Sequence, residues 1–253
     1  MIIKNFYKKI YISPFFYLLG ILSIITGVFK AFMIMYLIIF VHELGHITMA
    51  LIFKYGINKI NIYPFGGYTI FDVDINKGFF SEFMVFLGGI LFQFIFSIIF
   101  NFAIDDIYIH RIFNSYNTTI LTFNLLPIIP LDGSKLLNII LNKIFPFKIS
   151  HLLSIYLSYI FIIILFITNY RNLNMCIMAF LLLNILINEH KNHIFIFNNF
   201  LIERYIKDLH FRKNNFILGK RVNNMKKYLK NIFIVDNKYL TEKEVLADRF
   251  ILK

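Results

Sequence analysis

The stretch FVHELGHITMALIF, residues 40–53, places three ionisable side chains inside an otherwise apolar segment. From Ala31 to Phe53 the only formal charge is that of Glu43, and His42 and His46 lie on either side of it. Ionisable groups are unfavourable in the hydrocarbon core of a membrane, and where they occur they usually line a polar cavity between helices. The stretch therefore predicts a membrane helix that carries a functional site.

The composition of the whole chain also indicates a membrane protein. The 253 residues are 58% hydrophobic and 19% aromatic, whereas soluble domains are close to half apolar. Six segments almost free of charge are each close in length to the ~20 residues that a helix needs to cross a bilayer. They are residues 10–29, 31–53, 83–104, 112–131, 149–170 and 172–188. We therefore predict an all-α polytopic membrane protein with six transmembrane helices.

Basic residues between the predicted spans alternate from one side of the membrane to the other. Nine of them lie on the side of the N-terminus, and three, Lys30, Arg111 and Arg171, lie on the opposite side. The positive-inside rule then predicts that both termini are cytosolic. The formal net charge of +12 is explained better by a tail beside the anionic inner leaflet than by nucleic-acid binding, so no nucleic-acid partner is predicted. Cys176 is the only cysteine, which excludes a disulfide within the chain.

The segment after the second predicted span changes from a helical to an alternating pattern. Apolar residues alternate with others on both sides of Pro64-Phe-Gly-Gly67, which is typical of two short strands around a turn. We predict a β-hairpin at about 58–72, and an ordinary cytosolic loop is the alternative.

The chain organisation predicted from these patterns is a membrane core at 1–190 and a small cytosolic tail at 191–253. The tail ends in a strand, a turn and a helix. Thr241 is the predicted N-cap of that helix, and Glu244 occupies the capping-box position.

The chemistry of the site follows from His42-Glu43-Leu-Gly-His46, an H-E-x-x-H motif. Residues four apart lie on one face of a helix, so both imidazoles can bind one metal ion while Glu43 lies beside the open position. Zinc is the usual metal at such sites, and a neighbouring carboxylate can take a proton from the attacking water. The alternative is a hydrogen-bonded polar cluster without a metal.

A third protein ligand is predicted at the end of the fourth span. Asp132 is the only acidic residue in that span and its flanks, and it lies at the depth expected for His42 and His46. Pro127 and Pro130 would break the helix and turn the carboxylate inward. Taken alone, Asp132 could equally be an interfacial carboxylate.

Together these motifs resemble the site-2 protease family of intramembrane metalloproteases. The resemblance covers about residues 10–190 and rests on HELGH, on the PFGGY hairpin and on NLLPIIPLDG at the end of span four. It implies one zinc ion bound by His42, His46 and Asp132, with Glu43 as general base and electrostatic stabiliser. The substrate-binding residues that it implies are Asn124, Phe65, Gly66, Gly67 and Pro130, with the hairpin presenting an edge to an unwound substrate.

The chain departs from the family pattern in span three. The family's G-P-x-x-N-like segment is Gly88-Gly89-Ile-Leu-Phe-Gln93 here. Gly88 and Gly89 are predicted either to pack helices closely or to serve the site, and the sequence leaves both roles open.

Within the family the compact core is most similar to the sporulation branch, the stage IV factor B type. That resemblance implies release of a sporulation sigma factor from a membrane-tethered precursor, with inhibitory membrane proteins as further candidate partners. Members of that branch commonly carry a nucleotide-sensing CBS domain, but Ile232–Asp248 resembles half of a CBS pair at best, which makes ATP binding doubtful.

Several alternatives stay open. The chain could cleave an anti-sigma factor or signal-peptide remnants, or it could be a membrane protein that binds metal without proteolysis. Homo-oligomerisation is compatible with the sequence.

Overall fold

The computed structural model describes residues 10–63, 66–72, 75–207, 209–211 and 213–250. The chain divides into two compact units: residues 1–73 with 83–124, and residues 74–82 with 125–253. Phe65, one of the predicted substrate-binding residues, lies outside the described residues.

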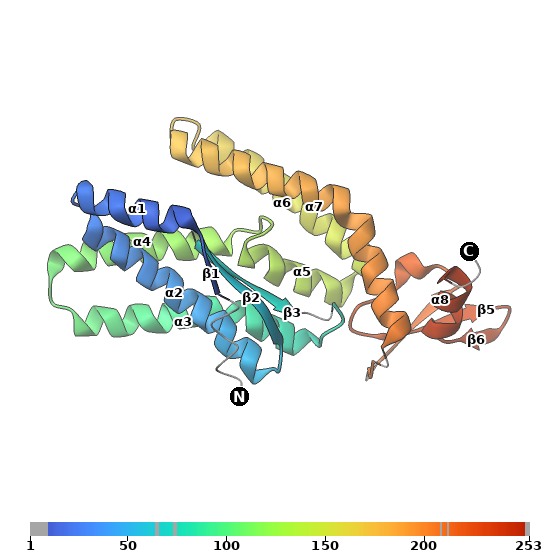
Figure 1. Cartoon of the computed structure of the whole chain (residues 1–253). Coiled ribbons are helices and arrows are strands. Elements are labelled where there is room, and N and C mark those ends of the chain that lie inside the picture. Colours follow the sequence, from blue (N-terminus) through green and yellow to red (C-terminus); the bar gives the residue numbers. More distant parts are fainter. Residues whose placement is uncertain (1–9, 64–65, 73–74, 208, 212, 251–253) are drawn as a thin grey trace. The chain divides into compact units, whose positions relative to one another are not determined.

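The first unit contains β1 (Ile10–Ile12), α1 (Pro14–Ile25), α2 (Phe29–Ile52), β2 (Gly56–Tyr63), β3 (Gly66–Asp72), most of α3 (Phe79–Ala103) and most of α4 (Ile107–Leu125) (Figure 1). Pro14 occupies the first turn of α1, where its missing N–H has no partner to lose. Gly27, with φ of 75°, makes the turn into α2. The helices α1 and α2 then pack through the rings of Phe16 and Tyr36, whose centroids are 4.6 Å apart.

The sheet of the first unit has the order β1-β2-β3. Its central strand β2 pairs antiparallel with β3, which lies in the segment predicted as a hairpin, and Gly66 and Gly67 begin β3. β1 pairs parallel with β2, a pairing that the sequence analysis does not predict. The helical hairpin α1–α2 supplies the long crossover that a parallel pair requires.

The second unit contains the remaining elements: α5 (Asp132–Ile144), α6 (Phe147–Thr168), α7 (Leu173–Ile206), β4 (Asn214–Leu218), the 3₁₀ turn η3 (Val222–Asn224), β5 (Lys230–Val235), β6 (Lys238–Leu240) and α8 (Glu242–Phe250). The sheet has the order β4-β5-β6. A buried apolar core joins it to the start of α6 and the end of α7, with the rings of Phe147 and Phe200 stacked at 4.3 Å. The predicted capping box is confirmed, because Thr241 and Glu244 exchange hydrogen bonds at the start of α8.

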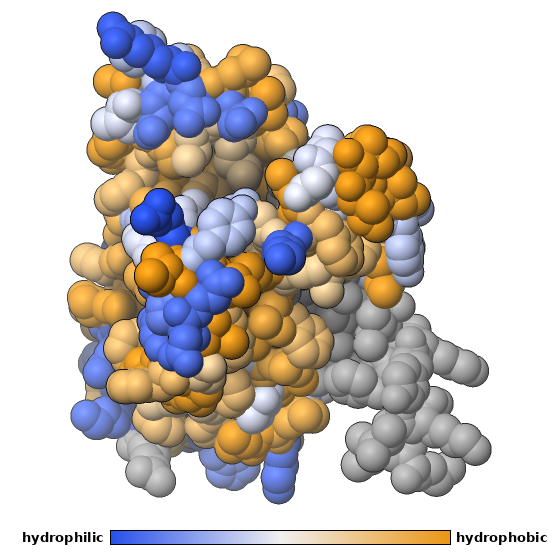
Figure 2. All heavy atoms as spheres, turned by 90° about the vertical axis from the view of Figure 1, so that its left-hand side faces the viewer, coloured by the Kyte–Doolittle hydropathy of each residue, from blue (hydrophilic) through white to orange (hydrophobic). Residues whose placement is uncertain are grey.

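Four helices of the described residues are long and apolar enough to cross a membrane: α2, α3, α6 and α7. The segments predicted as spans one and four also contain helices, but α1 has only 12 residues and α4 carries many polar side chains. The count of six spans therefore stays a prediction. Many large apolar side chains are exposed, among them Phe102 at 86% and Leu173 at 73%, as expected for helices that face lipid. Hydrophobic residues occupy most of the described surface on the face drawn in Figure 2, interrupted by hydrophilic patches.

Candidate metal centre

The two histidines of the H-E-x-x-H motif lie side by side on α2, and both are buried. His42 Nε2 and His46 Nε2 are 3.0 Å apart. Two nitrogen ligands at the usual zinc–nitrogen distance of about 2.0–2.1 Å in tetrahedral geometry would be about 3.3 Å apart. The spacing of the two Nε2 atoms thus fits a shared metal ion. Glu43 follows His42 on the same helix and is half-buried.

Each imidazole is held from the side opposite to its Nε2 atom. His46 Nδ1 is 2.8 Å from the backbone oxygen of Val85, and His42 Nδ1 is 2.9 Å from Gln93 Oε1. A carbonyl oxygen can only accept, so His46 Nδ1 carries a hydrogen, and in the neutral imidazole Nε2 then presents its lone pair. Histidines that bind metals are usually oriented in this way by a carbonyl or carboxylate oxygen.

Gly88 and Gly89 of α3 have different surroundings, which resolves the two roles left open by the sequence. Gly88 packs against Gly45 of α2, and a Cβ on Gly45 would meet the Gly88 oxygen at 2.3 Å. Gly89 lies against the two imidazoles, and a Cβ there would be 2.3 Å from His46 Nε2 and 2.7 Å from His42 Nε2. The first glycine permits close helix packing, and the second leaves space beside the two Nε2 atoms.

Asp132 begins α5 in the second unit and is also buried. Its Oδ1 is 2.9 Å from Lys135 Nζ, and the N-terminus of a helix favours a carboxylate. A Cβ on Gly133 would meet the backbone oxygen of Leu125 at 2.2 Å, so only glycine allows α5 to start this close to the end of α4.

The loop before Asp132 is anchored by α6. Ser158 Oγ accepts a hydrogen bond from the Ile129 amide at 3.1 Å and lies 3.2 Å from the Pro127 oxygen, to which it donates. α4 ends at Leu125, two residues before Pro127, as expected from the restriction that proline places on the residue before it. Asp132 therefore follows a loop that hydrogen bonds to α6 keep in place. Of the other predicted substrate-binding residues, Asn124 is half-buried near the end of α4, and Pro130 in this loop is exposed.

His42 and His46 of the first unit and Asp132 of the second unit are all buried, and each offers one atom that can bind a metal ion. Two imidazole nitrogens and a carboxylate oxygen are a donor set typical of catalytic zinc, which keeps a fourth position open. The donor chemistry, the Nε2 spacing and the space beside Gly89 all fit zinc.

Several residues that contact the predicted site residues were given no role in the sequence analysis. Gln93 and Asn117 were visible only as polar residues within apolar helices, a signal for a functional position in a membrane protein. The Val85 carbonyl and the Ser158 anchor carry no sequence signal, because any residue has a carbonyl and serine is common in membrane helices.

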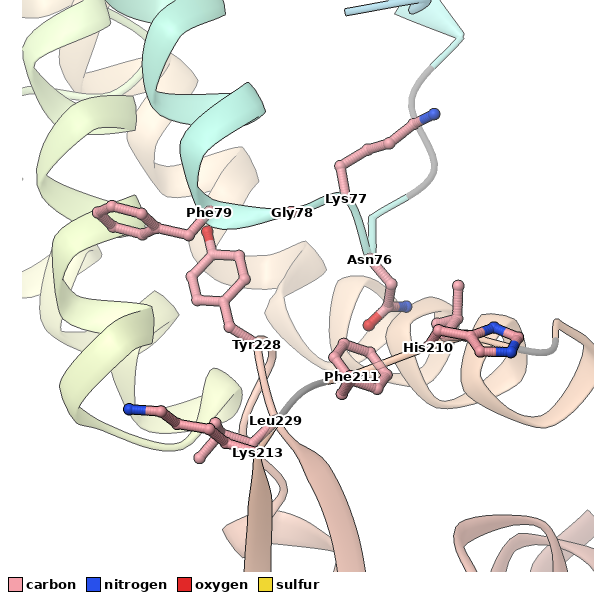
Figure 3. Close-up of a pocket in the computed structure, with 10 residues that line it drawn as sticks. Asn76, Lys77, Gly78, Phe79, His210, Phe211, Lys213, Tyr228 and Leu229 are labelled. Atoms are coloured by element: carbon pink, nitrogen blue, oxygen red, sulfur yellow. The ribbon is translucent and has the colours of Figure 1, made fainter.

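A separate cavity of about 350 Å³ lies in the second unit and does not include any of the predicted site residues. Residues before α3 and residues after α7 line it, among them Lys77, His210, Phe211 and Tyr228 (Figure 3). It belongs to the junction between the tail and the linker that precedes α3.

Comparisons with known proteins agree on one family. The sequence model of peptidase family M50 matches residues 30–109. Stage IV sporulation protein FB of Bacillus subtilis is 32% identical over 206 residues, which are 78% of this chain and 71% of that protein. A zinc metalloprotease of Methanocaldococcus jannaschii is 29% identical over 119 residues, 44% of this chain and 34% of that protein. The solved structure of a site-2 protease from Methanocaldococcus jannaschii aligns with a TM-score of 0.50 and 25% identity, covering 80% of this chain and 94% of that chain.

Proposed function

The chain belongs to peptidase family M50, the site-2 protease family, and from that premise we propose that it hydrolyses a membrane-tethered protein near the cytosolic face. Membership makes it an integral membrane metalloendopeptidase, and zinc is the metal that the family implies. The observation that carries the proposal is the pair of buried imidazoles on α2. Their Nε2 atoms face each other beside Gly89, on a helix able to cross a membrane.

We propose that a single zinc ion is bound by His42, His46 and Asp132. The orientation of His46 by the Val85 carbonyl and the burial of all three side chains support this ligand set. When bound, zinc supplies a Lewis acid and lowers the pKa of a bound water to about 7.

Glu43 is the proposed general base. It adjoins a proposed ligand on the same helix, and its carboxylate can accept the proton of the attacking water and pass it to the leaving amide nitrogen. The buried surroundings of His42 and His46 limit the access of bulk water, so that charges within the site act in a medium of low polarity.

The substrate must present an extended segment to this site, because a helical substrate has its carbonyls hydrogen-bonded within the helix. We propose that β3, which pairs with β2 on one side, offers its other edge to the unwound segment by strand addition. Asn124 and Pro130, together with Phe65, Gly66 and Gly67, are the proposed contacts. Asn124 can donate a side-chain hydrogen bond to a carbonyl oxygen of the substrate.

For the substrate itself we propose the precursor of a sporulation sigma factor. The similarity to Stage IV sporulation protein FB, over 71% of that protein, supports this choice. The distribution of basic residues supports cytosolic termini and hence release of the product into the cytosol.

The test is co-expression of the full chain with three tethered candidates: a sigma-factor precursor, an anti-sigma factor and a signal-peptide remnant. Release of the sigma factor alone, abolished by Glu43→Gln without loss of bound zinc, is the expected result. Release that continues with Glu43→Gln would exclude Glu43 as the general base. Cleavage of the anti-sigma factor or the signal-peptide remnant alone would show that this protein, and not the sigma-factor precursor, is the substrate.

Zinc stoichiometry of purified Asp132→Ala tests the third ligand separately. We expect weaker zinc binding and no cleavage, because a catalytic zinc site needs three protein ligands. Full zinc content in this variant would remove Asp132 from the ligand set.

A further inference from the structure

A chain of buried amides extends from His42 across three helices of the first unit. Gln93 of α3 is fully buried, and Asn117 of α4 is 7% exposed. Gln93 Oε1 lies 2.9 Å from His42 Nδ1, and Gln93 Nε2 lies 3.0 Å from both the backbone oxygen and the side-chain Oδ1 of Asn117.

The contact with Asn117 determines which way the Gln93 amide faces. A backbone carbonyl can only accept a hydrogen bond, so the Gln93 atom beside the Asn117 oxygen must be the NH₂ group. The other end of the amide, Oε1, is then directed at His42 and can only accept. His42 Nδ1 must therefore donate, and in the neutral ring its Nε2 keeps the lone pair that a metal requires.

The two histidines thus reach the same tautomer by different means. His46 is held by the backbone carbonyl of Val85, which no side-chain substitution removes. His42 depends on the side chain of Gln93, and through it on Asn117. We propose that Gln93 and Asn117 are positioning residues that hold His42 in its metal-binding tautomer and orientation. The proposal rests on the proposed function, because it assumes that His42 binds the metal.

The principal test is the zinc affinity of the full chain in detergent, measured by chelator competition in the inactive Glu43→Gln background. Gln93→Met removes the acceptor at similar volume, and we expect binding 10- to 100-fold weaker, the usual loss for an outer partner of a metal ligand. Gln93→Glu keeps an oxygen for His42 and is expected to bind more tightly than Gln93→Met. Equal affinities of the two variants, or Gln93→Met within threefold of the parent, would overturn the proposal.

Asn142→Leu is the matched control. Asn142 is 2% exposed and hydrogen-bonded to Asn138 on α5, so its loss tests the general effect of removing a buried amide. We expect lower thermal stability and unchanged zinc affinity.

A second readout does not depend on zinc. Nitrogen-15 NMR of histidine-labelled, metal-free protein reports the tautomer directly, with the His42 signal assigned by its absence in His42→Gln. We expect the Nδ1–H form in the parent and a mixture of tautomers in Gln93→Met, because the oxygen that accepts from Nδ1 is then absent. An unchanged tautomer in Gln93→Met, together with unchanged zinc affinity, would refute the positioning role of Gln93.

These results separate the two proposals. Suppose that the parent protein binds zinc and the Gln93 variants bind it more weakly, yet no tethered protein is cleaved. The positioning role of Gln93 and Asn117 would then stand, and the proposed peptidase function would fail. If the parent bound zinc and cleaved substrate while Gln93→Met behaved like the parent, only the positioning role of Gln93 and Asn117 would fail.

Discussion

Replacing Gly89 with alanine tests whether the space beside the two imidazoles is needed for catalysis. The added Cβ would lie 2.3 Å from His46 Nε2, whereas ordinary contacts begin at 3.4 Å. His46 Nε2 must therefore move by about 1 Å, and a misplacement of that size can lower a catalytic rate on the order of 100-fold. The helix itself should gain up to about 1 kcal/mol, since alanine is the better helix former.

The assay compares the rate of substrate release in cells with the zinc affinity and thermal midpoint of the purified chain. For Gly89→Ala we expect release about 100-fold slower and weaker zinc binding, with a midpoint lowered by no more than in Gly45→Ala, because the gain in helix propensity offsets part of the overpacking. This combination distinguishes a damaged site from a damaged fold.

Gly20→Ala is the control for a glycine within an apolar helix. Its Cβ would meet the ring of Phe32 at 3.7 Å, an ordinary contact, so cleavage and zinc affinity should match the wild-type protein. If Gly89→Ala also behaved like the wild-type protein in both assays, the space beside the imidazoles would have no part in the site and the reasoning would be wrong.

Four further predictions concern stability in detergent. Gly45→Ala places a Cβ 2.3 Å from a backbone oxygen of α3, so we expect overpacking to lower the unfolding free energy by about 1–3 kcal/mol, measured by chemical denaturation. Lys227→Met leaves the buried Glu82 carboxylate without the ammonium that lies 2.8 Å away, a loss of about 3–5 kcal/mol that Glu82→Gln in the same chain should largely restore. Thr241→Ala should weaken α8 by about 1 kcal/mol, detected by hydrogen exchange. Because hydrogen bonds from Thr241 lower the pKa of the Glu244 carboxyl, the stabilisation by Glu244 is present at neutral pH and is lost as the pH falls through that lowered pKa; Glu244→Gln should remove this pH dependence.

The parts of the fold that were predicted correctly depend on properties that a short segment carries by itself. The helix that bears His42 and His46 follows from the length and apolar character of its segment, and the cap of α8 follows from residues three apart. The helix α5 was not predicted, because no element was assigned to the residues between spans four and five. The pairing of β1 was missed because its partner β2 is about fifty residues away and three residues carry too little pattern.

Sequence alone determined the membrane class and the family, and it supplied the residues proposed to react. Charge spacing along one segment and the chemistry of H-E-x-x-H need no knowledge of distant neighbours. Tertiary structure decided what surrounds those residues: the contact of Gly89 with the imidazoles, the approach of Gly45 to Gly88, and the link from His42 through Gln93 to Asn117. The physical reason is that close packing and hydrogen-bond direction depend on the crossing of helices far apart in the chain, and no local period encodes where two helices cross.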